Sequence, residues 1–309
     1  MDTWLIVLCF AVIAVMRVVQ KLCVKRVSGA VAGNTFFHYG GYYNLVSALF
    51  AFVLLCVSGF SGFTWGTALC AAGTAVFLAI SLFTSLEALK SCSLIVCQMF
   101  SVGALCIPCI VGIFLFDEPM SVWQWLGVLL FIISTYFIVR PATPKESMDK
   151  AGKLSLRNLL LLVIMLLAEG GTMVMQKAFG VFVPNGNVST YSFLMFALNS
   201  LFLYATYAFL ALPRRFCAAK DSAVAEPRRL SRLLLVCGAF LASAVFAINQ
   251  LVTTMGKSVH SAVLFSVSSA ISIIITLAVG AFYYKERVSF LNALGILLCV
   301  VAIAIINFL

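Results

Sequence analysis

Residues 117–127 read Asp-Glu-Pro-Met-Ser-Val-Trp-Gln-Trp-Leu-Gly, and residues 285–295 read Lys-Glu-Arg-Val-Ser-Phe-Leu-Asn-Ala-Leu-Gly. The two stretches begin 168 residues apart, and each follows one long apolar run and opens another. In both, a glutamate is followed after three positions by a serine, after three more by an amide side chain, and then by Leu-Gly. This spacing predicts a short polar hinge between two membrane helices, used twice in a duplicated fold.

The hinge residues have distinct predicted roles. Each serine is placed to N-cap the second helix by accepting a hydrogen bond from a free backbone N–H. Each glycine allows two helices to approach closely. The residues concerned are Glu118, Ser121, Gly127, Glu286, Ser289 and Gly295.

Composition excludes a soluble domain. Of the 309 residues, 63% are hydrophobic and only 10% are charged, whereas a soluble domain has about 25% charged residues. With a mean hydropathy of +1.14, the chain requires lipid as its solvent. The net charge of +10 does not indicate nucleic-acid binding, because the charges lie in short loops between apolar runs.

The eleven cysteines do not predict a metal or redox site. All but Cys217 lie inside apolar runs, where cysteine behaves as a small hydrophobic residue. Cys106 and Cys109 match a C-x-x-C pattern, but no second pair and no histidine lies near them. We therefore expect packing roles, and neither a metal nor a cofactor.

The hydropathy pattern predicts ten spans, each of about 20 residues, which is the length that crosses the hydrocarbon core. The expected fold is all-α and integral to the membrane. The spans are 4–24, 35–57, 65–86, 91–115, 122–140, 158–178, 190–211, 232–254, 261–284 and 289–308.

Short matches between the two halves extend the repeat beyond the hinges. Gln20-Lys21 recurs as Gln176-Lys177, Asn44 falls near Asn199, and residues 75–77 recur as 244–246. We therefore predict a first five-helix repeat at 1–140, a linker at 141–157 and a second repeat at 158–309. Because five is odd, the repeats enter the membrane in opposite senses, as an inverted repeat.

The basic residues predict an orientation. The alternate loops near residues 25–26, 90, 140–157, 214–232 and 285–287 hold 16 of the 20 Lys and Arg residues. By the positive-inside rule these loops are cytoplasmic and both termini lie outside. We expect the plasma membrane as the location, with a monomer or a homodimer as the assembly.

Taken together, the doubled unit resembles the EamA domain of the drug/metabolite transporter superfamily. The hinges Glu118-x-x-Ser121-x-x-Gln124-x-Leu126-Gly127 and Glu286-x-x-Ser289-x-x-Asn292-x-Leu294-Gly295 are similar to that family's hinge signature. Phe116-Asp117 and Tyr284-Lys285 stand where the family often has Leu-Gly, and the ninth span lacks the family's proline, which Pro108 represents in the fourth. The resemblance implies a secondary transporter or exchanger of small polar metabolites, such as amino acids or related solutes.

Glu169 is the first candidate for a transport site, because it lies midway along the sixth span between Ala168 and two glycines. A carboxylate at membrane depth suits proton coupling or the binding of a cationic group. The alternative is a structural salt bridge with Arg17, in the first span. Arg17 itself either clamps a substrate carboxylate with its planar fork of donors or extends to the cytoplasmic surface.

Other polar residues of the spans have two interpretations each. Asn249 and Gln250, and likewise Asn44 beside Tyr43, either contact a ligand or bond a neighbouring helix; the tyrosine also fits an interfacial belt. Gln98 is a further candidate, although with Ser101, Ser268 and Ser272 it fits helix packing. For Gln20, Lys21, Gln176 and Lys177, positions near helix ends favour anchoring at the membrane interface.

Transport by alternating access is the predicted function, with a small-molecule substrate and a proton as a potential coupling ion. An intramembrane enzyme would need clustered bases or metal ligands, whereas the chain has two distant histidines and no H-E-x-x-H or G-x-S-x-G motif. We therefore expect no catalytic residues. A receptor or assembly subunit without transport activity is the remaining alternative.

Overall fold

A computed structural model describes residues 3–28, 31, 34–92, 94–104, 106–115, 121–139, 156–218, 231–257, 264, 267–268, 271–272, 275, 279 and 290–308. Within these residues all regular structure is helical, as the sequence predicts. The helices are α1 (Thr3–Ser28), α2 (Asn34–Ser58), α3 (Trp65–Ser91), α4 (Leu94–Gly103), α5 (Cys106–Leu115), α6 (Val122–Val139), α8 (Leu156–Phe182), α9 (Val188–Ala218), α10 (Arg232–Gly256) and α12 (Phe290–Phe308).

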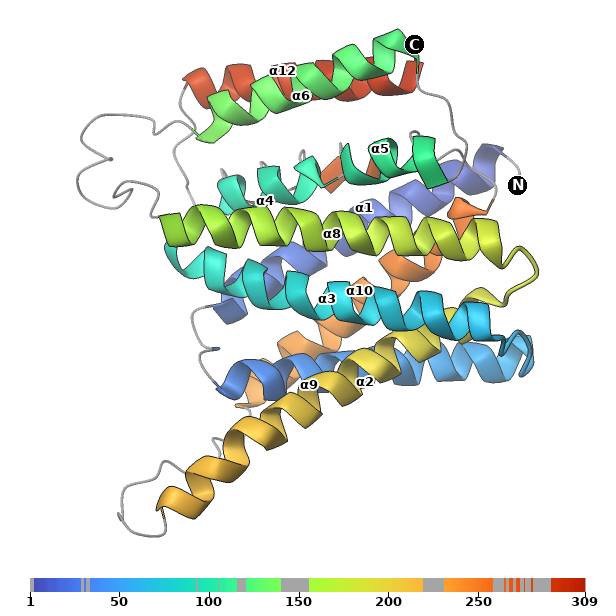
Figure 1. Cartoon of the computed structure of the whole chain (residues 1–309), viewed down its shortest axis with the longest axis vertical. Helices are drawn as coiled ribbons and strands as arrows, with labels where there is room; N and C mark the ends of the chain where they lie inside the picture. The colour runs from blue at the N-terminus through green and yellow to red at the C-terminus, as the bar shows by residue number, and fades with distance from the viewer. Residues whose placement is uncertain are drawn as a thin grey trace.

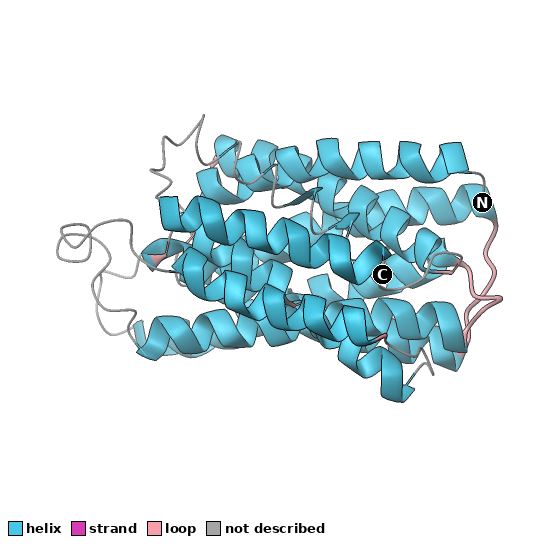
Figure 2. Cartoon of the chain, turned by 90° about the horizontal axis from the view of Figure 1, so that it is seen from above, coloured by secondary structure: helices cyan, strands magenta, loops and turns pink. Residues whose placement is uncertain are grey.

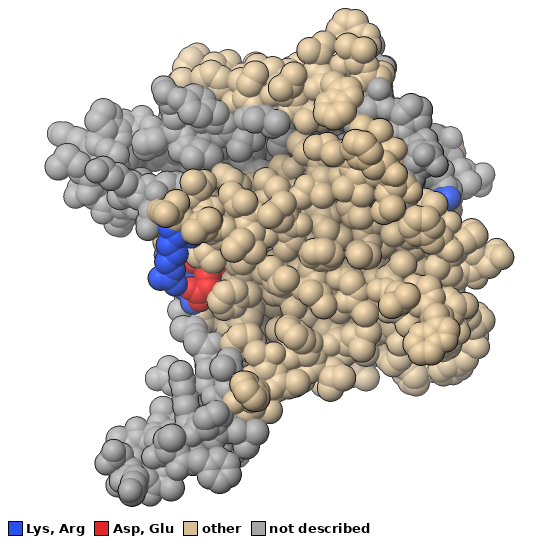
Figure 3. Space-filling view, viewed as in Figure 1, with Lys and Arg blue, Asp and Glu red and all other residues tan. Residues whose placement is uncertain are grey.

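Within the described residues, six helices are long and apolar enough to cross a membrane: α1, α2, α3, α8, α9 and α10. Their outer surfaces carry large apolar side chains, including Trp65 of α3 at 87% exposure and Trp4 of α1 at 85%. In Figure 3 the visible described Lys, Arg, Asp and Glu lie at opposite edges of the molecule, with an uncharged band between them. This surface belongs to an integral membrane protein.

Hydroxyl side chains start three of the helices. Ser121 Oγ accepts from the backbone N–H of Gln124 at 3.2 Å, and Gln124 Oε1 accepts from the N–H of Ser121 at 2.9 Å. This reciprocal capping box confirms the N-cap predicted for Ser121. Thr64 and Ser231 cap α3 and α10 in the same way. The other predicted cap, Ser289, lies outside the described residues, as do Glu118 and Glu286.

The helices pack in pairs; α3 and α8 lie along one direction, whereas α1, α9 and α10 cross them obliquely (Figures 1 and 2). The main pairs are α2 with α9, α6 with α12, α3 with α8, and α1 with α10, and α3 also contacts α9 as α10 contacts α2. Gly127 of α6 and Gly295 of α12 are both buried. Their burial is compatible with the close helix approach predicted for them.

Buried polar contacts join α2 to α9. Asn199 Nδ2 donates to Asn44 Oδ1 at 3.1 Å, and Ser200 Oγ donates to the carbonyl of Gly41 at 2.9 Å. An aromatic and aliphatic core surrounds these bonds, with Tyr39 and Tyr191 almost fully buried. This core places α2 and α9 firmly against α10.

The fourth and seventh predicted spans have different boundaries in the structure. The fourth span, predicted as one helix over 91–115, is two helices, α4 and α5. Pro108 has no N–H to give the carbonyl of Ala104, which accepts instead from the N–H of Ile107 at 3.1 Å and so tightens the chain at the break. Helix α9, predicted to end at 211, continues through Pro213 to Ala218, since Arg and Ala sustain a helix beyond the apolar run.

Candidate functional site

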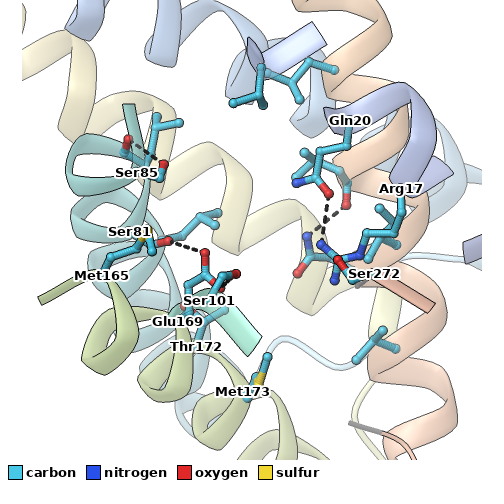
Figure 4. A pocket seen from close by; sticks show the side chains of 18 of the residues that line it. Arg17, Gln20, Ser81, Ser85, Ser101, Met165, Glu169, Thr172, Met173 and Ser272 are labelled. Carbon is cyan, nitrogen blue, oxygen red and sulfur yellow. Dashed lines mark hydrogen bonds between the residues drawn. The ribbon is translucent and has the colours of Figure 1, made fainter. Parts of the chain in front are cut away.

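A cavity of about 200 Å³ lies inside the bundle, lined by α1, α2, α3, α4, α8 and α10 and by Ser268 and Ser272. Its apolar lining is interrupted by a few polar side chains, drawn in Figure 4. The polar residues of the lining include Arg17, Gln20, Ser101, Glu169, Gln176 and Asn249. Polar groups are costly at this depth in a membrane protein, so their convergence marks a candidate binding site.

Glu169 faces the cavity from α8. Its carboxylate accepts a hydrogen bond from Ser81 Oγ of α3 at 3.3 Å and another from Ser101 Oγ of α4. The two hydroxyls satisfy part of the carboxylate and hold it in place, while its remaining lone pairs are available to a ligand. Glu169 therefore lines the cavity, and its role in transport stays a prediction.

The glycines beside Glu169 permit close helix packing. A Cβ on Gly170 would lie 2.3 Å from Ile107 Cδ1 of α5 and 2.9 Å from the Ala104 carbonyl at the α4–α5 break. A Cβ on Gly171 would lie 2.7 Å from the ring of Phe77 of α3. Helix α8 is continuous through both positions, so the glycines serve close approach and do not unwind the helix.

Arg17 enters the cavity from α1. Its Nη1 donates to Gln20 Oε1 at 2.9 Å, whereas its buried Nε has no hydrogen-bond partner. No ion pair joins Arg17 to Glu169, both of which are described residues. The salt bridge considered from the sequence is therefore absent, and Arg17 lines the cavity without extending to the surface.

An amide pair closes another part of the wall. Gln176 Nε2 of α8 donates to Asn249 Oδ1 of α10 at 2.5 Å, and Asn249 Nδ2 donates to the carbonyl of Val245 at 2.8 Å. Gln176 is only 5% exposed. Asn249 thus bonds a neighbouring helix and also lines the cavity, and contact with a ligand stays a prediction.

The predicted interfacial role of Gln20 and Gln176 is wrong, because both line the cavity. Lys177 is likewise buried, at 7% exposure, and Lys21 lies in α1 with its side chain outside the described set. Hydropathy placed the helix ends too early. Helix α1 runs to Ser28 and α8 to Phe182, so these glutamines lie well inside their helices.

The serines expected to serve helix packing also belong to the site. Ser101, Ser268 and Ser272 line the cavity, and the hydroxyl of buried Ser268 has no hydrogen-bond partner. The positions of these serines in apolar segments did not indicate which of them face the cavity. For Ser101, the hydrogen bond to Glu169 in the structure shows this directly.

Of the remaining candidates, Tyr43 lines the cavity, whereas Asn44 and Gln250 do not. Asn44 bonds Asn199, as described above, and Gln250 Oε1 accepts from Ser192 Oγ of α9 at 2.6 Å. Both amides therefore join helices. Gln98 lies in α4, and its side chain is outside the described residues.

At one end of the bundle, loops from the two halves of the chain are bonded together. We call this the latched end, formed by residues 59–64 and 183–187. Asn187 Nδ2 donates to Ser58 Oγ and Ser61 Oγ, each at 3.3 Å, and Thr190 Oγ1 donates to the Ser61 carbonyl at 2.6 Å. A Cβ on Gly62, whose φ is +80°, would lie 2.7 Å from the Asn187 nitrogen.

Lys257, just after α10, adds to the latched end. Its Nζ donates to the carbonyls of Pro184 and Gly186, at 3.1 and 2.5 Å, and lies 5.3 Å from the centre of the Phe179 ring. Partial burial lowers the pKa of Lys257 from its ordinary value. The ammonium group thus closes the α8–α9 loop onto the end of α10.

Cys92 lies at the opposite end, between α3 and α4. Hydrogen bonds from Cys97 and, to a lesser extent, Ser91 outweigh partial burial and lower the pKa of Cys92 from 9.0 to about 7. Nine described cysteines have free thiols. Among the described residues, no group of three or more His, Cys, Asp or Glu side chains could hold a metal ion.

Comparisons with known proteins identify the fold alone. No protein-family profile matches the chain, and no curated protein matches its sequence. Among solved structures, a crystal structure of a protein matches it at a TM-score of 0.60 and 13% identity, over 96% of this chain and 94% of that chain. The whole chain therefore has a known fold, and identity this low carries nothing about activity.

Proposed function

We propose that the protein is a secondary transporter that carries a small polar solute across the membrane by alternating access. The observation that carries this proposal is the cavity in which Arg17 and Glu169 face inward without pairing with each other. Ionisable groups inside a membrane bundle are rare and costly, and in transporters they mark the substrate or ion site.

Cavity size supports a small solute. Drug-sized ligands occupy pockets of about 300–1,000 Å³, and this cavity holds about 200 Å³. A small metabolite fits such a volume better than a large apolar drug.

The helix packing supports two inverted five-helix repeats with ten spans in all. A half-turn that exchanges the two halves would put α10 in place of α3, α1 in place of α8, and α2 in place of α9. The α3–α8 pair would become α10–α1, and the α3–α9 pair would become α10–α2. All four of these pairs occur. The pairs α2–α9 and α6–α12 convert into themselves. Asn44 and Asn199, which correspond in the two halves, bond to each other, as expected of residues near such an axis.

A pseudo-two-fold arrangement of this kind agrees with the resemblance of the hinges to the EamA domain. It also gives the motion that transport needs, in which one repeat rocks against the other around the central site. The predicted spans at 91–115 and 122–140 correspond to α4–α5 and α6, and that at 289–308 corresponds to α12. The span at 261–284 falls mostly outside the described residues.

Hydrogen bonds between residues 58–61 and 187–190 close one end of the bundle. We infer that the cavity opens toward the opposite end, where α1 and α3 end, on the side predicted to be cytoplasmic. Release of the latched end would then expose the site to the other side of the membrane.

Flux across a sealed bilayer tests the proposal. Purified protein in proteoliposomes should exchange internal unlabelled solute for external labelled solute, with a panel of amino acids, nucleosides, sugars and organic cations as probes. A ligand that binds the folded protein also raises its melting temperature, which selects the probes. Ligand binding without flux under any imposed solute or pH gradient would contradict a carrier and favour a receptor.

A further inference from the structure

The cavity presents opposite charges on two separate walls. Arg17 and Gln20 of α1 and nearby Ser272 form one wall, and Glu169, Ser81, Ser101 and Thr172 form the other (Figure 4). The two charged groups come from different halves of the chain. They face the same small space, and no ion pair joins these two described residues.

Each charged group has unused hydrogen-bonding capacity. A guanidinium has five N–H donors, and the bonds of Arg17 leave its buried Nε without a partner. A carboxylate has about four acceptor positions, and Glu169 accepts from two serine hydroxyls. Each group can therefore bind a solute without breaking the contacts that orient it.

A solute with a single charge would satisfy one wall and leave the other unpaired. Because an unpaired charge in a low-dielectric interior is costly, the best occupant neutralises both. A solute that carries an anionic and a cationic group does so in one binding event, and its net charge of zero lets it cross without adding charge to the site.

We propose that the cavity binds a dipolar solute, with the solute's anionic group on Arg17 and its cationic group on Glu169. The inference rests on the proposed function and names the substrate class of the same site. The Gln176–Asn249 amide pair lies beside the charged walls and supplies neutral donors and acceptors for the rest of the solute.

Binding to the purified full chain in lipid nanodiscs tests this assignment by calorimetry. The probes are alanine, glutamine and phenylalanine, each with the analogue that lacks the amine and the analogue that lacks the carboxylate. For alanine these are propionate and ethylamine. We expect at least one dipolar probe to bind about 10- to 100-fold more tightly than both of its analogues, the range of a charge-assisted hydrogen bond.

Two variants assign the ends of the solute. Arg17→Gln should lower the affinity for the dipolar probe to that for its amine analogue, with the amine itself unaffected. Glu169→Gln should lower it to that for the acid analogue. The charge-matched controls Lys90→Gln and Glu87→Gln remove an exposed ion pair at the end of α3, outside the cavity, and should change neither affinity.

The inference is overturned if no dipolar probe exceeds both analogues, or if both variants weaken all probes equally. The first comparison uses the wild-type protein, so it stands even if a variant does not fold. The transport proposal and the dipolar site can fail separately. If a dipolar solute binds and no flux is seen, transport alone is contradicted. Undiminished flux of the dipolar solute in Arg17→Gln contradicts the dipolar site alone.

Discussion

Substitution of Gly170 by alanine tests the packing that brings Glu169 and Ser101 together. The new Cβ would lie 2.3 Å from Ile107 Cδ1, 2.6 Å from Ile107 Cβ and 2.9 Å from the Ala104 carbonyl oxygen. The last two atoms belong to the stem and the backbone of the α4–α5 break, so rotation of a side chain does not relieve the overlap. Helix α8 must move away from α4 and α5.

The magnitude follows from two opposing effects. Overpacking of a well-filled core costs about 1–3 kcal/mol, while alanine in place of a helix-interior glycine returns roughly 0.5–1 kcal/mol. We expect a net destabilisation of about 1–2 kcal/mol, which lowers the apparent melting temperature by about 2–4 °C for each kcal/mol. Because the Ser101–Glu169 hydrogen bond spans the displaced surfaces, solute affinity should also fall.

Two glycines provide controls for a thermal melt in detergent. At Gly256 the nearest atom to an added Cβ is Leu264 Cδ2 at 3.7 Å, an ordinary contact, so Gly256→Ala should leave the melting temperature unchanged or raised. At Gly73 the nearest atoms are the flexible end of Met175 at 3.0 Å, so Gly73→Ala should be intermediate. A Gly170→Ala protein as stable as Gly256→Ala, with unaltered solute affinity, would refute the reasoning.

Three further predictions concern the carboxylate, the thiol and the latched end. Glu169→Gln should abolish proton-driven flux while the protein still folds, and undiminished pH-driven flux would exclude coupling through this carboxylate. The rate at which Cys92 reacts with a thiolate-specific reagent should rise with pH and reach half its maximum near pH 7. Cys92→Ser should remove this reaction, and a half-maximum near pH 9 would contradict the hydrogen bond from Cys97. Since the pKa of Cys92 is lowered in the folded state, its contribution to stability is present above pH 9 and is lost as the pH falls through about 7. Asn187→Ala removes the bonds to Ser58 and Ser61, so amide hydrogens of residues 59–64 and 183–187 should exchange faster, and unchanged exchange there would count against a latch.

The helical fold was largely predictable, because a chain in lipid must satisfy its backbone within each segment. The start of α6 shows this at a single residue, since Ser121 is followed after three positions by an amide and forms the expected cap. The break at Ala104 was less predictable. One proline in an apolar run either kinks a helix or ends it. Here helix α4 ends, and Gly170 packs against the point where it ends.

Prediction of the site was uneven for a related reason. Glu169 and Arg17 were identifiable because an ionisable residue in an apolar span has few explanations. Amide and hydroxyl residues have several, so Asn249 of the cavity and Gln250 of the α9–α10 contact, adjacent in sequence, could not be separated. On a helix, neighbouring residues point about 100° apart, and a neighbouring helix decides which of the two meets the cavity.

By itself, the sequence determined that this chain is helical, that its solvent is lipid, and that one short motif recurs 168 residues apart. These properties depend on composition and on local spacing, which act along the chain. Only the tertiary structure decided that Arg17 and Glu169, 152 residues apart, share a cavity, that Asn44 meets Asn199, and that Asn187 joins two loops. Contacts between distant segments arise from the packing of whole helix faces, and no local pattern encodes which faces meet.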